Sequence, residues 1–115
     1  MGLLGRDVLF VEDAEATLRH LEADPNPLAR SVARRVRALV PILRSDCLHG
    51  EVVRKARIPS MLRGRYSLGN LYVEDLPAFW RLLYSVGRRR QERYVLVVAI
   101  IDHRTYSAWF HRGRR

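Results

Sequence analysis

The apolar positions in the first half of the chain recur at the spacing of α-helices. Residues 12–24 place alanine and leucine on one face, and residues 28–46 carry an apolar stripe opposite a row of arginines. The intervening PNP breaks this pattern, so the two segments are predicted to form a helical hairpin. Pro41 is expected to kink or end the second helix. The sequence DVLFVED, residues 7–13, allows a short strand before the hairpin.

The spacing changes to that of β-strands in the second half. Residues 71–86 are predicted to hold two short strands, separated by a turn that Pro77 favours. Residues 87–92, GRRRQE, are expected to form a polar turn. Residues 93–101, RYVLVVAII, are rich in β-branched side chains and predict a central strand. Residues 104–110 are expected to form a last short helix or strand.

Taken in order, these elements predict one α+β domain over residues 1–115. A helical hairpin at the N-terminal end is expected to pack on a small antiparallel β-sheet, and a short helix is expected at the C-terminal end. The arginine-rich segment 47–70 is interpreted as a connection between the hairpin and the sheet.

The sequence has few features that indicate a cellular compartment. No apolar run approaches the roughly 18 residues that span a membrane, so no membrane partner is expected. The N-terminal segment meets Asp7 at once and is a poor signal peptide. The chain has a single cysteine, Cys47, which excludes a disulfide within it. A cytoplasmic location is therefore expected.

The positive charge is concentrated in the second half. The chain has 21 lysines and arginines against 12 acids, a net charge of +9. Residues 1–50 are neutral overall, so the whole excess lies in residues 51–115. A basic surface of this density attracts polyanions, of which nucleic acid is the usual one. Alternatively, the positive charge serves solubility alone or binds an acidic protein partner.

A group of polar side chains follows the most apolar strand. Cleavage of RNA without a metal needs a base for the 2′-hydroxyl, cations for the phosphate and an acid for the leaving oxygen. Preorganised cations usually contribute most, and guanidinium binds phosphate through two parallel hydrogen bonds, which suits Arg81 and Arg104. Histidine titrates nearest neutral pH, and arginine neighbours favour its neutral form, so His103 is the candidate base.

Each of these residues has a structural alternative. Arg81 can pair with Glu74 or Asp75 across a turn, and His103 can cap the last helix or be held by Asp102. Asp102 itself suits an N-cap better than a catalytic role. No His, Cys and acid residues have metal-ligand spacing, and no glycine-rich loop cradles phosphate, so neither metal nor cofactor is expected.

Two segments, NLYVEDLPAFWRLLYSV and VLVVAIIDHRTYSAWF, together resemble the RelE/ParE toxin superfamily, in the style of its archaeal RelE-like members. The motifs WRLLYSV (residues 80–86) and IIDHRTY (residues 100–106) carry the resemblance, which covers residues 50–111 and extends to the hairpin only by pattern. It implies a RelE-like fold and the toxin of a type II toxin–antitoxin system. Such a toxin cleaves messenger RNA on the ribosome and inhibits translation. The implied partners are a cognate antitoxin protein, the ribosome and messenger RNA.

The resemblance also implies roles for single residues. Arg81 falls on the strand arginine that holds phosphate, and Arg104 on the arginine at the end of the last strand. His103 and Tyr106 lie where members place acid or aromatic groups; Phe110, the alternative aromatic, lacks a hydroxyl. The implied catalytic residues are Arg81, His103, Arg104 and Tyr106. The implied RNA-binding residues of the basic connection are Lys55, Arg57, Arg63 and Arg65.

Two alternative functions remain open. A binding module of the same fold without nuclease activity, of the gyrase-poisoning type, would share the architecture. A degenerate toxin would only bind its antitoxin. The cluster of His103, Arg104 and Tyr106 favours cleavage over both.

Overall fold

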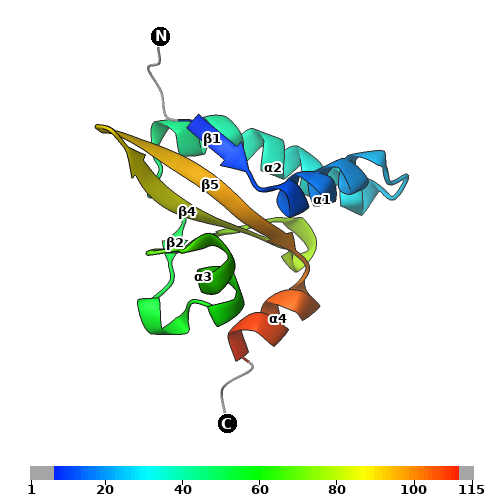
Figure 1. Ribbon diagram of the computed structural model, residues 1–115. Helices are drawn as coiled ribbons and strands as arrows, with labels where there is room; N and C mark the ends of the chain where they lie inside the picture. The colour runs from blue at the N-terminus through cyan, green and yellow to red at the C-terminus, as the bar shows by residue number, and fades with distance from the viewer. Residues whose placement is uncertain (1–6, 112–115) are drawn as a thin grey trace.

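The computed structural model describes residues 7–111 and shows an α+β fold, as predicted (Figure 1). The helices and strands, in chain order, are β1 (Asp7–Phe10), α1 (Glu12–Ala23), α2 (Pro27–Ser45), β2 (Glu51–Val52), η1 (Lys55–Arg57), α3 (Ser60–Tyr66), β3 (Tyr72–Asp75), η2 (Pro77–Phe79), β4 (Arg81–Arg89), β5 (Glu92–Ile101) and α4 (His103–His111).

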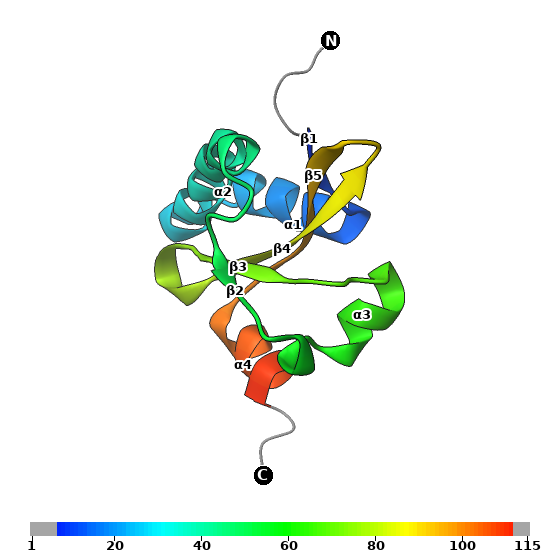
Figure 2. The same cartoon turned by 90° about the vertical axis from the view of Figure 1, so that its left-hand side faces the viewer.

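The strands form one sheet of five, in the order β1-β5-β4-β3-β2. Helices α1 and α2 cover one face, and α3 and α4 lie on the other (Figures 1 and 2). The strands from β2 to β5 pair antiparallel, as predicted, but the sheet as a whole is mixed because β1 runs parallel to β5, with Asp7 opposite Tyr94. The hairpin is also not the first element, since β1 precedes it. The sequence allowed a strand at residues 7–13, but local pattern does not encode its parallel pairing, because its partner lies more than eighty residues away along the chain.

Strand β5 is buried on both faces, which explains its nearly continuous apolar sequence. In its pairing with β4, Leu83 lies opposite Ala99 and Tyr84 opposite Val97, so Val98 is an extra residue in a bulge. Val97 therefore packs into the core under α1 and α2, whereas Val98 and Ala99 pack into the core on the side of α3 and α4. Strand β5 therefore contributes side chains to both hydrophobic cores.

The second helix continues past Pro41, so of the two outcomes predicted there, a kink or an end, the end does not occur. It begins where the sequence indicated, since the side chain of Asn26 accepts a hydrogen bond from the backbone of Leu28 and a proline follows at the first turn. It then continues to Ser45. Leu39 and Leu43 are completely buried on either side of the proline. Their packing holds the helix together despite the missing backbone donor.

The segment 47–70 is more structured than a connection. It contains the short strand β2, the single turn η1 and helix α3, whose Leu62 is buried in the core beside α4. Elements this short have no clear period, and their existence depends on contacts with the sheet. Residues 87–92 are also mostly strand, and only two residues separate β4 from β5.

Candidate functional site

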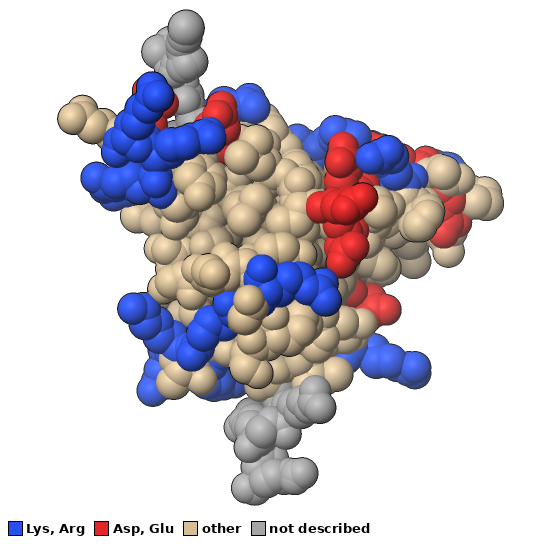
Figure 3. Space-filling model, in the orientation of Figure 1, with Lys and Arg blue, Asp and Glu red and all other residues tan. Residues whose placement is uncertain are grey.

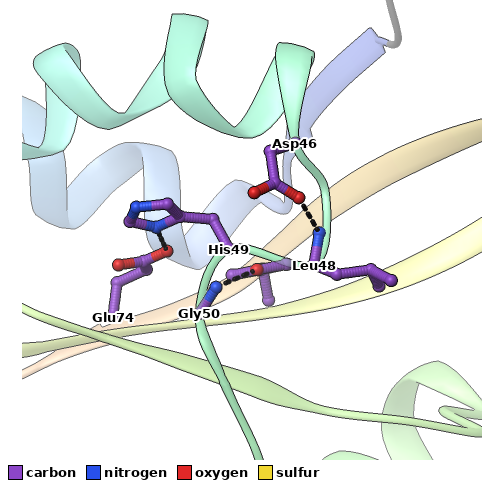
Figure 4. A network of polar contacts seen from close by, with 6 residues as sticks. Asp46, Leu48, His49, Gly50 and Glu74 are labelled. Carbon is purple, nitrogen blue, oxygen red and sulfur yellow. Dashed lines mark hydrogen bonds and ion pairs between the residues drawn. The ribbon is translucent and has the colours of Figure 1, made fainter.

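A polar network fixes the point where the segment after α2 meets the sheet (Figure 4). His49 Nδ1 lies 2.6 Å from Oε2 of Glu74, a carboxylate that is almost fully buried. The backbone N–H of Gly50 donates to the hydroxyl of Tyr84 at 2.9 Å. A Cβ atom at Gly50 would lie 2.8 Å from the carbonyl oxygen of Val73, so only glycine allows this approach.

Tyr84 has a structural role in this network. Burial raises the pKa of Tyr84 to about 12, although the hydrogen bond from Gly50 acts in the opposite direction. The phenol is therefore neutral at physiological pH, and its oxygen accepts the hydrogen bond from Gly50. Its ring stacks on Tyr72 with 5.3 Å between centroids, which ties β3 to β4.

Arg81 stands at the start of β4 and makes several contacts within the protein. Its Nε lies 3.2 Å from Oδ1 of Asp75, its cross-strand neighbour. One of the structural alternatives for Arg81 is thus correct, and Glu74 is excluded as its partner because it pairs with His49. Nη1 of Arg81 donates to the carbonyl oxygens of Phe79, at 2.8 Å, and Trp80, at 3.2 Å. The face of the guanidinium lies over the Tyr106 ring, 4.8 Å from its centroid.

Asp102 is the N-cap of α4, as its structural alternative proposed. Its Oδ1 accepts a hydrogen bond of 2.9 Å from the backbone N–H of Thr105. Hydrogen bonds from Thr105 lower the pKa of Asp102, and the charge of Arg104 lowers it further. The cap fixes the direction in which the first turn of α4 leaves the strand, and therefore where the following side chains lie.

Tyr106 borders a pocket of about 200 Å³ between β2, the segment after it, β3 and α4. Its ring stacks on Phe110 with 4.6 Å between centroids, and Phe110 is buried in the core. Tyr106 is thus the aromatic residue of α4 whose hydroxyl can serve chemistry. The residues that line the pocket are Glu51, Val52, Val53, Arg54, Arg57, Val73, Tyr106 and Phe110.

The other predicted catalytic residues lie outside this pocket. His103 precedes Tyr106 by one turn on the same face of α4, and its imidazole contacts the ring of Phe79, with 5.9 Å between centroids. Arg104 is exposed and points about 100° away around the helix. The four residues therefore lie along one end of the sheet, where Arg81 and Tyr106 touch each other and His103 and Arg104 flank them.

The predicted RNA-binding residues fall in three places. Arg57 lines the Tyr106 pocket, and its Nη2 reaches the carbonyl oxygen of Phe110 at 3.5 Å. Lys55 and Arg63 lie together at a second depression, where Nη2 of Arg63 donates to the carbonyl oxygen of Lys55 at 2.6 Å. Arg65 pairs with Asp13 of α1 at 3.2 Å and lies on another side of α3.

Sequence reasoning missed three contributors to this end of the molecule. Arg54 and Glu51 line the pocket beside Arg57. Phe79 was not distinguished from its neighbours, yet its side chain is 70% exposed. No local signal marked Phe79, because the sequence indicates a turn after Pro77 but not the positive φ angles at its centre.

A further basic surface lies at the tip of the β4–β5 hairpin. Figure 3 shows cationic side chains gathered at this tip and over α3, and acidic side chains over the start of α1. The arginines of the tip are Arg88, Arg89, Arg90 and Arg93, all exposed. Arg89 is partly engaged, since its Nη2 lies 3.6 Å from Asp7 and its guanidinium lies 5.5 Å from the centre of the Tyr94 ring.

Within residues 7–111, no three or more His, Cys, Asp and Glu side chains are grouped so that they could hold a metal ion. None of the helices in the same range combines the length and the apolar character that crossing a membrane requires. Comparison of the chain with protein-family models, with curated proteins and with solved structures gives no significant match.

Proposed function

We propose that the protein is an endoribonuclease that cleaves messenger RNA on the ribosome, without a cofactor, as the toxin of a type II toxin–antitoxin system. The observation that carries the proposal is the convergence of Arg54, Arg57 and Tyr106 on one pocket, next to Arg81. The resemblance of the sequence around residues 80–86 and 100–106 to the RelE/ParE superfamily supports the choice of substrate. The proposed partners are a cognate antitoxin and the ribosome, and the proposed location is the cytoplasm.

The pocket offers the groups that the reaction needs. Attack of a 2′-hydroxyl on the adjacent phosphorus leaves a 2′,3′-cyclic phosphate and releases the 5′-oxygen, which takes up a proton. Arg57 and Arg54 neutralise the charge that builds on the phosphate. The base is either His103, which lies outside the pocket one turn before Tyr106 on α4, or Glu51, which lines the pocket itself. Tyr106 is placed to donate a proton or to hold the substrate.

A second function has a specific observation in its favour. The donors of Arg81 are directed at Asp75 and at two backbone carbonyls, which makes this arginine a positioning residue for the end of the sheet. Since His103 and Arg104 also lie outside the pocket, the alternative is an RNA- or protein-binding module of RelE/ParE type without nuclease activity. The two functions differ in whether phosphodiester bonds are broken.

The test is cleavage of a defined message on purified ribosomes. Wild-type protein is expected to produce cuts that require the ribosome and leave 2′,3′-cyclic phosphate ends. Glu51→Gln and His103→Ala identify the base, because only the variant that lacks it should lose rate by roughly 10²–10⁴-fold. Arg34→Ala on α2 is the matched control, since this exposed arginine lies in the neutral half of the chain. Binding to ribosomes without any cut would favour the non-nucleolytic function.

A further inference from the structure

Phe79 occupies an unusual position for a large apolar side chain. Its ring is 70% exposed, the highest value among the large apolar residues that the structure describes. Trp80 and Trp109, in contrast, are half-buried against the two cores. Exposure of an aromatic ring is unfavourable unless something covers it, because the apolar surface remains in contact with water.

The backbone that carries Phe79 is strained. In the turn from Pro77 to Trp80, the N–H of Trp80 donates to the carbonyl oxygen of Pro77 at 3.2 Å. The two central residues, Ala78 and Phe79, have φ angles of 58° and 64°. Positive φ at both central positions defines a type I′ turn, which asparagine and glycine usually occupy. Residues with a Cβ atom adopt this conformation at a cost in free energy.

Contacts on both sides of the turn keep it in this conformation. The N–H of Leu76 donates to the carbonyl oxygen of Trp80 at 2.9 Å, and Nη1 of Arg81 donates to the carbonyl oxygen of Phe79 at 2.8 Å. These hydrogen bonds hold the backbone of the turn that carries the exposed ring. Strain that the surrounding structure maintains at an exposed position is typical of functional sites.

The surroundings of the ring indicate what it contacts. His103 lies beside it, with an angle of 59° between the two ring planes, and Arg104 follows on α4. Through Arg81 the turn is joined to the Tyr106 ring at the pocket. The nearby acids are Asp75, which pairs with Arg81, and Asp102, which caps α4 and interacts with Arg104. An aromatic face next to arginines suits an unpaired nucleotide, because its flat base can stack on the ring and its phosphate is anionic.

We propose that Phe79, with His103 beside it, is a stacking platform for one unpaired base of single-stranded RNA next to the Tyr106 pocket. The inference rests on the proposed function in that it takes RNA as the substrate, but it concerns binding and not cleavage. In this proposal the strained turn has a function, because its left-handed backbone presents the ring of Phe79 to the nucleic acid.

The experiment uses a single-stranded oligonucleotide of about six nucleotides, within the usual site size, with 2′-O-methyl groups that prevent cleavage and a central 2-aminopurine. Stacking quenches the fluorescence of this base. Wild-type protein is expected to bind and quench it. Phe79→Gly is expected to weaken binding by roughly 5–150-fold, since stacking contributes about 1–3 kcal/mol per base. The same variant should melt no lower than wild type, because glycine relieves the positive φ.

Three further variants distinguish stacking from simple apolar contact and from relief of backbone strain. Phe79→Trp should keep affinity and quenching, and Phe79→Leu should lose both although it remains apolar. Ala78→Gly, the matched control, should raise the melting temperature and leave binding unchanged, since it relieves strain without removing the ring.

Equal RNA binding by wild type and Phe79→Gly overturns the platform, as does full binding by Phe79→Leu, which would point to a protein partner on this surface. A wild type that binds and quenches without cleaving messages on ribosomes overturns the proposed function and leaves the platform standing.

Discussion

The guanidinium of Arg81 lies 4.8 Å from the centre of the Tyr106 ring, so the start of β4 meets the first turns of α4 through this pair. The contact makes Arg81 a support for the pocket as well as a charge beside it. Its ion pair with Asp75 and its hydrogen bonds to the turn before β4 have the same effect. One residue therefore positions both the phenol of Tyr106 and the ring of Phe79.

Replacement of Arg81 should affect stability and cleavage together. For Arg81→Ala we expect a loss of about 1.5 kcal/mol in the free energy of unfolding, near the lower end for charged hydrogen bonds because Asp75 is exposed. The rate of cleavage should fall by roughly 10²-fold, which is more than the loss of stability explains, since Tyr106 loses the contact that positions it at the pocket. Arg81→Lys keeps the charge but not the fork of donors, and should recover little. Chemical denaturation and ribosome assays measure the two effects. Full activity of a folded Arg81→Ala would exclude Arg81 from the site.

The hydroxyl of Tyr106 can be tested without disturbing its ring. Tyr106→Phe preserves the stacking on Phe110 and the contact with Arg81, so the melting temperature should stay within roughly 2–4 °C of the wild type. If the phenol transfers a proton, single-turnover cleavage should slow by roughly 10²-fold or more. An unchanged rate at unchanged stability assigns Tyr106 to packing and leaves Glu51 and His103 as the acid–base groups.

The sequence predicted the elements that have a clear period. The two amphipathic helices, the central strand and the turn at Pro77 all occur close to where the pattern placed them. The partner of β1 was not predictable, because parallel pairing with β5 depends on how the whole chain folds. Strand β2 and helix α3 were missed since two and seven residues are too few to show a period.

The position in the fold of the polar residues after β5 was predictable, but the residues that line the pocket beside them were not. The polar residues after β5 do lie at one end of the sheet, as their place in the sequence suggested. The pocket, however, is completed by Glu51 and Arg54 from a segment that pairs with β3, and no local signal marked them. The strain at Ala78 and Phe79 was also invisible, since the sequence there shows a turn but not its handedness.

Pro41 lies inside α2, where side-chain packing outweighs the low helix propensity of proline. It is exposed within α2, between the buried Leu39 and Leu43. Proline is about 3 kcal/mol less favourable than alanine inside a helix, whereas its rigidity stabilises the native state by up to about 1 kcal/mol through the unfolded chain. Pro41→Ala should therefore raise the free energy of unfolding by roughly 2 kcal/mol, measured by urea denaturation. Cleavage should be unaffected, because α2 lies on the opposite face of the sheet from α4 (Figure 1). A destabilised variant would mean that the backbone of α2 is adapted to the proline.

The N-cap of α4 should make part of the stability depend on pH. The pKa of Asp102 is lower in the folded protein than in the unfolded chain, through hydrogen bonds from Thr105. Its contribution is therefore complete above the ordinary aspartate range, about pH 4, and is lost as the pH falls through the lower folded value. Asp102→Ala should cost about 1 kcal/mol at neutral pH, as typical N-caps do.

Asp102→Asn separates the hydrogen bond from the charge. Asparagine is an equally good N-cap, so this variant should remain close to wild type in stability at about pH 7. Its stability should fall less than that of the wild type as the pH is lowered from about 5 to 2, because the amide does not titrate. Parallel acid-denaturation curves for the wild type and Asp102→Asn would show that another group causes the pH dependence.

The exposed arginines at the tip of the β4–β5 hairpin should contribute to RNA binding through phosphates. The prediction concerns Arg88, near the end of β4, and Arg90, in the turn that follows it. Both are exposed, as are the control residues Arg34 and Arg35 of α2. Changing either pair to glutamine removes two positive charges, so the long-range effect of net charge on binding is the same in both double variants.

Direct contacts with single-stranded RNA each contribute about 0.7 to the slope of log affinity against log salt. The Arg88→Gln/Arg90→Gln variant should therefore bind with a slope smaller by about 1.4, whereas Arg34→Gln/Arg35→Gln should leave the slope near that of the wild type. Titrations of one oligonucleotide between about 50 and 200 mM salt measure this difference. Equal slopes for the two variants would show that the tip does not touch RNA and that its charge acts only through the net field of the protein.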